Sequence, residues 1–75
     1  MDQMISTELP EPNVEFRREI YSRIGNQRLA ARALGISEGH LSDIVNGWIL
    51  PGRDLAQRAS ALFGKPVQEL FPNLR

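Results

Sequence analysis

Cysteine is absent from the 75-residue chain, and His40 is its only histidine. Disulfides and thiolate metal sites are therefore excluded, and one imidazole cannot build a zinc site. A chain this short usually needs a disulfide, a metal, a partner subunit or well-packed helices for stability. We expect one small domain held by helix packing, with dimerisation as a further source of stability and with no cofactor.

Long apolar runs are missing as well. No segment approaches the roughly 18 residues that a membrane span requires. The N-terminus lacks a basic stretch followed by an apolar one, so we expect no signal peptide. The sequence also lacks a glycine-rich phosphate loop and a paired-carboxylate signature. These absences predict a cytoplasmic protein that is not an enzyme and makes no membrane contact.

The net charge is zero, but the charges are unevenly distributed. Residues 1–15 carry four acids and no base, whereas residues 16–75 carry nine bases against five acids, a net charge of +4. Eight of the nine bases are arginine, the side chain best suited to forked phosphate contacts. The excess fits a nucleic-acid binder or an ordinary solvated helical surface.

Residues 1–13 hold two prolines and three acids without a clear period, and we expect a flexible acidic tail there, either a frayed terminus or a functional arm. The folded domain is expected over residues 14–72. Its first helix is capped by Asn13 and ends at Gly25. Its inward stripe is Phe16, Ile20 and Ile24, flanked by Val14 and Tyr21.

Two short helices follow, joined at Gly35. The second helix is capped by Asn26, and its apolar positions are Leu29, Ala30, Ala33 and Leu34. The third is capped by Ser37, buries Leu41, Ile44 and Val45, and stops at Asn46-Gly47. A glycine at the joint lets the helices cross steeply and projects the start of the third helix outward. This geometry fits a helix-turn-helix motif. The second helix of such a motif, which is the third helix of this chain, enters the major groove of DNA.

The C-terminal part predicts two more helices. Residues 53–63 form the fourth, and Pro66 suits the first turn of a short fifth helix that carries Val67, Leu70 and Phe71. The loop between the third and fourth helices contains Trp48, Ile49 and Leu50. We expect Ile49 or Leu50 to fill the core, whereas an interface role and a core role for Trp48 are both open.

The chain from Gln27 onward resembles the lambda-repressor and Cro-like (XRE-type) helix-turn-helix family. The shared marks are Gln27, Ala31, Leu34-Gly35, Ile36-Ser37, Leu41, Ile44, "NGWILP" over residues 46–51, "LFG" over 62–64 and "ELF" over 69–71. The resemblance covers about residues 14–72 and implies a five-helix all-α fold. It also implies a transcriptional regulator, a repressor of phage or mobile-element type, that binds double-stranded DNA as a homodimer. The chain departs from the family in two places. Ala30 stands where the family has a leucine, and Trp48, Ile49 and Leu50 follow Asn-Gly, where the family often has a lysine or an arginine.

The resemblance assigns three sets of site residues. Base contacts fall to Glu38, Gly39, His40, Ser42 and Asp43, and carboxylates among them would accept from cytosine amino groups. Backbone contacts fall to Asn26, Gln27, Arg28, Ser37, Asn46 and Arg53, with Arg28 and Arg53 nearest the third helix and Arg32 and Arg58 as further candidates. The dimer interface falls to Trp48, Ile49 and Leu50. Simpler roles stay open: capping for Asn26 and Gln27, dipole compensation for Glu38, and a tie to the following loop for Asn46.

A protein-interaction module is the alternative function. An antitoxin could bind a basic toxin through the acidic residues 1–15, or the Trp48 surface could bind another protein. The two acids of the third helix, Glu38 and Asp43, and the zero net charge favour this alternative. A DNA-binding antitoxin would satisfy both interpretations.

Overall fold

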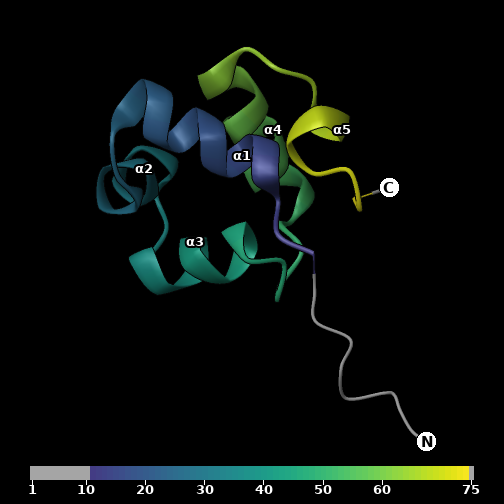
Figure 1. Cartoon of the computed structure of the whole chain (residues 1–75), viewed down its shortest axis with the longest axis horizontal. Coiled ribbons are helices and arrows are strands. Elements are labelled where there is room, and N and C mark those ends of the chain that lie inside the picture. Colours follow the sequence, from purple (N-terminus) through teal and green to yellow (C-terminus); the bar gives the residue numbers. More distant parts are fainter. Residues whose placement is uncertain (1–10, 75) are drawn as a thin grey trace, which may run out of the picture.

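The computed structural model describes residues 11–74, which form helices joined by short turns (Figure 1). They are α1 (Val14–Glu19), the π-helical turn η2 (Ile20–Ile24), α2 (Gln27–Leu34), α3 (Glu38–Val45), α4 (Arg53–Phe63) and α5 (Val67–Leu70). Residues 11–74 contain no strand, which confirms the all-α class. Every helix in this range is too short or too polar to cross a membrane. Most of the expected acidic tail lies outside the described residues.

Three buried phenylalanine rings form the centre of the hydrophobic core. The Phe16 ring of α1 lies 4.7 Å from the Phe71 ring and 6.0 Å from the Phe63 ring, between centroids. Tilted and edge-on arrangements at these distances are favourable for aromatic pairs. The other buried apolar residues come from all the helices: Ile20, Ala30, Ala31, Leu34, Leu41, Ile44, Val45, Leu55, Ala56, Ala59 and Leu70. The phenylalanine cluster joins α1 to α4 and α5, while α2 and α3 pack on the same core on the side away from α5 (Figure 1).

The first helix departs from the regular helix that its apolar spacing predicts. Its last turn, η2, is a π-helix in which the backbone N–H of Gly25 donates to the carbonyl of Ile20 at 2.9 Å. Gly25 ends the turn, as expected, with a φ of +116° that side-chain-bearing residues rarely adopt. Over a single turn, the spacing of apolar residues is nearly the same in a π-helix and in an α-helix. The sequence therefore does not predict this π-helical turn.

Several apolar residues of the first two helices are exposed where the sequence predicts packing. Val14 and Tyr21 were expected beside the inward stripe, yet both face solvent. Leu29 and Ala33 of α2 are also exposed, while Ala30 is fully buried at the position where the family has leucine. A small side chain at position 30 lets α2 pack closely on the core, and Leu29, one residue earlier, then points to solvent.

Asn13 belongs to the folded domain rather than to the tail. It was expected to cap the first helix, but its side chain makes no capping hydrogen bond. The side-chain Nδ2 instead donates to the carbonyl of Ile44 at 2.6 Å, and the backbone N–H donates to the carbonyl of Val45 at 2.9 Å. Asn13 is buried, and it fixes the C-terminal end of α3 to the start of α1.

The connection between α4 and α5 holds a charged cluster. Lys65 Nζ lies 3.2 Å from Glu15, 3.6 Å from Glu19 and 3.7 Å from Glu69. The hydrogen bond to Glu15, opposed by partial desolvation and aided by all three carboxylates, raises the pKa of Lys65 above its ordinary value of 10.5. Lys65 thereby links α1 to α5.

Pro66 has extended backbone and precedes α5, so the expectation that it lies in the first turn of this helix was wrong by one residue.

Candidate nucleic-acid interface

The turn between α2 and α3 has the local structure that the sequence predicts. The side chain of Asn26 caps α2 by accepting from the N–H of Leu29 at 2.8 Å. Ser37 Oγ caps α3 by accepting from the N–H of His40 at 3.1 Å. Gly35 ends α2 with a φ of +75°, the left-handed conformation that glycine adopts at little cost. The chain therefore leaves α2 and enters α3 within three residues.

A side chain from α4 holds the C-terminal end of α2. Arg58 Nη1 donates to the carbonyl of Leu34 at 2.7 Å, and Arg58 Nη2 contacts Asp54 at 3.1 Å. A Cβ atom at Gly35 would lie only 3.3 Å from Arg58 Nη1, a second reason for glycine there. Arg58 was a candidate for phosphate neutralisation; the structure gives its guanidinium a different role, which is to complete the end of α2.

The faces of α3 separate cleanly. Leu41, Ile44 and Val45 are buried in the core. The predicted base-reading residues lie on the opposite side: Glu38, Gly39, His40 and Asp43 are exposed, and Ser42 is half-buried. Because the buried stripe packs in the core, Ser37 caps one end and Asn13 binds the other, α3 presents these residues to solvent.

The end of α3 is tied to the following loop by backbone atoms. The N–H groups of Trp48 and Ile49 donate to the carbonyl of Asp43 at 2.9 and 3.4 Å. Asn46 was expected to make this tie, but its side chain donates back to Ser42 Oγ at 3.5 Å. The expectation was wrong because backbone donors close the turn without a side chain. Asn46 is exposed.

The N-terminal ends of α2 and α3 share a surface hollow of about 590 Å³. Its lining residues are Tyr21, Asn26, Gln27, Arg28, Leu29 and Glu38. Three of the predicted backbone-contact residues and one predicted base-contact residue are thus brought together. Tyr21 was missed as a site residue: its hydroxyl accepts from Gln27 Nε2 at 3.3 Å. Its position five residues after Phe16, off the inward stripe, was the available signal.

The arginines differ in what surrounds them. Arg28 lines the hollow, and within residues 11–74 it makes no salt bridge. Arg18 and Arg23 pair with Glu15 and Glu19 on their own helix. Arg53, the other arginine expected near α3, does not line this hollow; it lines a groove between α4 and α5. The positive charge nearest the hollow is therefore that of Arg28.

Gly39 has no structural requirement for glycine within the described residues. A Cβ atom built at Gly39 meets nothing within 4 Å, and its backbone is not in the left-handed region. Glycine inside a helix costs roughly 0.5–1 kcal/mol relative to alanine. The packing of the described residues therefore does not explain why glycine, rather than a residue with a side chain, stands at this exposed position of α3.

The loop after α3 exposes all three of its large apolar side chains. Trp48 is 63% exposed, Ile49 39% and Leu50 56%. The expectation that Ile49 or Leu50 fills the core was wrong, because side chains of the helices already close it and the loop runs over the surface. Three adjacent large apolar side chains are therefore exposed together on one loop.

No family model, curated protein or solved structure matches the chain. Membership of the lambda-repressor and Cro-like family therefore stays a proposal that depends on the residue pattern.

Proposed function

We propose that the chain is a sequence-specific transcriptional regulator, a repressor with a lambda-repressor-like five-helix domain, that inserts α3 into the major groove of double-stranded DNA. The observation that carries the proposal is the face of α3: its exposed residues project from a helix whose opposite side is buried and whose ends are anchored. A major groove admits one α-helix, and base edges are read by side chains near its N-terminus.

The hollow between α2 and α3 supplies the contacts to the DNA backbone in this proposal. The side-chain amide of Gln27 and the guanidinium of Arg28 donate to phosphate oxygens, assisted by Asn26 and by the N-terminal end of α2. Tyr21 joins them, because its hydroxyl lies at the same hollow and can donate to a phosphate while it accepts from Gln27. Ser37, Asn46 and Arg53, which do not line the hollow, complete the proposed set of backbone contacts. These contacts set the position of α3 without reading sequence.

Sequence is then read by the exposed face of α3. Glu38 and Asp43 accept hydrogen bonds from cytosine amino groups, and His40 and Ser42 contact neighbouring bases. Gly39 allows the backbone of α3 to approach the base edges closely. Two carboxylates also repel phosphates, so affinity depends on the arginines and on correct bases opposite the carboxylates.

The exposed loop residues Trp48, Ile49 and Leu50 form the subunit contact of a homodimer in this proposal. Two copies related by a two-fold axis bind half-sites about one helical turn apart on a palindromic operator. Pairing two weak half-site contacts raises affinity through effective concentration. The dimer therefore compensates for a reading face that carries negative charge.

A protein-interaction module is the second candidate, and the exposed Trp48 loop favours it. In that case Glu38 and Asp43 bind basic groups of a protein, as an antitoxin binds a toxin. The predicted acidic segment 1–15 would contribute further carboxylates. If the chain does not bind DNA, the protein-interaction module is the favoured function.

A salt titration tests the DNA proposal. The full chain is mixed with labelled double-stranded DNA of random sequence, and the bound fraction is measured by mobility shift at several salt concentrations. A DNA reader releases counterions from each phosphate it contacts, so log Kd rises linearly with log salt at about 0.9 per contact. Binding that is absent, or that does not change with salt, would contradict the proposal.

A further inference from the structure

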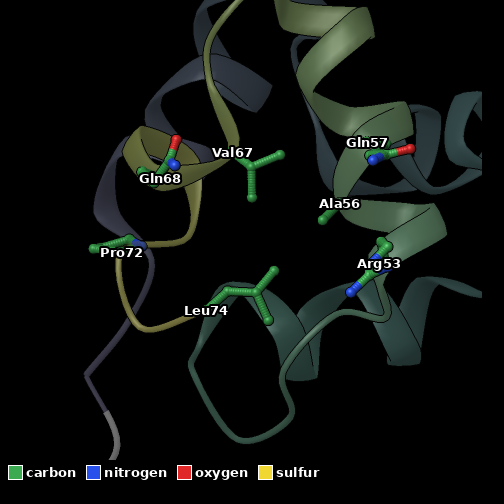
Figure 2. A pocket seen from close by; sticks show the side chains of 7 residues that line it. All are labelled: Arg53, Ala56, Gln57, Val67, Gln68, Pro72 and Leu74. Carbon is green, nitrogen blue, oxygen red and sulfur yellow. The ribbon is translucent and has the colours of Figure 1, made fainter.

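A groove lies between α4, α5 and the C-terminal residues 72–74 (Figure 2). It holds about 740 Å³. The side chains of Ala56, Val67 and Leu74 converge on it, whereas those of Arg53, Gln57 and Gln68 stand around them (Figure 2). An apolar floor with a few polar groups at the rim, in a hollow of several hundred Å³, is the usual form of a binding site.

The Trp48 loop is the complementary feature on the same chain. Residues 46–52 carry no charge, and two backbone hydrogen bonds to the Asp43 carbonyl hold Trp48 and Ile49 in place. A fixed loop presents its indole without a large ordering cost on binding. The loop leads through Pro51 and Gly52 directly into Arg53, which lines the groove, so protrusion and groove are continuous along the chain.

We propose that the groove between α4 and α5 receives Trp48 of a second copy of the chain. The inference rests on the homodimer of the proposed function and adds the surface that accepts the loop. A two-fold axis uses each protrusion and each groove once, which closes the assembly at two copies. Among the residues that the structure describes, the groove lining contains no acid, and the guanidinium of Arg53 can stack on the entering indole.

The size of this contact decides how strong the dimer is. A tryptophan side chain buries about 150–250 Å². With a similar area of groove covered each time, two Trp48 contacts bury at most roughly 600–1,000 Å², because Trp48 is already partly covered in its own chain; this lies below the 1,200–2,000 Å² of standard stable interfaces. We therefore expect a weak, reversible dimer that dissociates on dilution and forms fully when two copies lie on adjacent half-sites.

Because Trp48 is the only tryptophan, its fluorescence reports on its own burial. The full chain, without DNA, is followed over a concentration series by sedimentation and by emission wavelength. The expected result is a rise from the monomer mass of 8.5 kDa toward twice that value, with a parallel blue shift of the emission. A chain that stays monomeric at every concentration would overturn the inference, as would a dimer whose emission does not shift.

Two variants then test which surfaces meet. Trp48→Ala lacks the protrusion but keeps the groove, whereas Val67→Glu keeps the protrusion but charges the groove. Each alone should be monomeric. Mixed together, they can form only one of the two contacts, so heterodimers should require a higher concentration than the wild-type dimer, and the emission of the Val67→Glu chain should shift only when Trp48→Ala is added. Self-association of Val67→Glu would overturn the inference, because Trp48 would then pack elsewhere.

Controls cover misfolding and general stickiness. Leu62→Ala removes an exposed leucine of α4 outside the groove and should dimerise like the wild type. If Val67→Glu does not fold, Gln57→Glu with Gln68→Glu charges only exposed rim positions and replaces it in the mixing test. No DNA is present in these measurements, so a failure here and a failure of DNA binding are distinguished.

Discussion

The side-chain amide of Asn13 donates a hydrogen bond to the carbonyl of Ile44 across 2.6 Å, although the two residues are 31 positions apart. The bond is buried, and it is paired with the backbone bond from Asn13 to Val45. The last carbonyls of a helix have no partner within that helix. Asn13 supplies partners for α3 from outside, and in doing so it fixes the orientation of the proposed reading helix.

Replacing Asn13 tests this role against ordinary helix capping. Asn13→Ala should lower the free energy of unfolding by about 1 kcal/mol, because the Ile44 carbonyl loses the hydrogen bond from Asn13 and keeps only the one from the Gly47 N–H at 3.1 Å. Asn13→Asp should lose a similar amount, because a carboxylate cannot donate. Aspartate is a good helix cap, so denaturant unfolding that shows Asn13→Asp as stable as the wild type would contradict the donor role.

We expect Arg58 to contribute to the stability of the fold rather than to DNA affinity. Arg58→Met removes the hydrogen bond to Leu34 and should cost about 1 kcal/mol, a charged hydrogen bond reduced by solvent screening. Asp54→Asn removes only the exposed ion pair and should cost less than about 0.5 kcal/mol. Chemical denaturation of both variants measures the difference. If Arg58→Met keeps full stability and instead loses DNA affinity, Arg58 is a phosphate contact and the assigned role is wrong.

Gly39→Ala should change stability and DNA affinity in opposite directions. The added methyl meets open space, so helix α3 should gain about 0.5–1 kcal/mol. In the proposed complex the same methyl would lie where the backbone approaches the bases, and DNA affinity should fall roughly tenfold. Gly52→Ala, also in open space but outside α3, is the control and should bind DNA like the wild type. Unchanged affinity for Gly39→Ala would rule out a close backbone approach.

Lys65 makes stability sensitive to alkaline pH. Its pKa is raised in the folded chain, chiefly by the hydrogen bond to Glu15, so its contribution is complete below pH 10.5 and is lost as pH rises through the higher folded value. The thermal midpoint should therefore fall above pH 10.5 more steeply for the wild type than for Lys65→Gln.

Melting curves between about pH 8 and 12 give the two slopes. Equal slopes would mean that the charged cluster of Lys65, Glu15, Glu19 and Glu69 adds nothing to folding.

Local features of the fold could be predicted from the sequence. Asn26 and Ser37 cap helices within their own segment, and Gly35 takes the positive φ that a tight turn requires. The buried stripe of α3 follows from the spacing of Leu41, Ile44 and Val45. In each case the cause and the effect lie within about four residues, so one helical period suffices to read them.

Contacts between distant segments could not be predicted in this way. Arg58 reaches Leu34 across 24 positions, and Asn13 reaches Ile44 across 31. From the sequence alone, helix capping is a reasonable role for Asn13 and phosphate binding for Arg58. Only the folded chain shows that their side chains bind the carbonyls of Ile44 and Leu34. The candidate site shows the same limit: Tyr21 comes to Gln27 only because Gly25 turns the chain between η2 and α2.

The central claim, that α3 reads bases while the hollow between α2 and α3 grips the backbone, is tested most directly by selecting bound sites from random double-stranded DNA. Wild type, Arg28→Ala and Asp43→Ala are selected in parallel and the enriched sites are sequenced. Arg28→Ala should return the wild-type site with weaker binding to every sequence, and Asp43→Ala should change the preferred base at one position of each half-site. If no site is enriched, or if both variants return the same altered preference, α3 is not the reading helix.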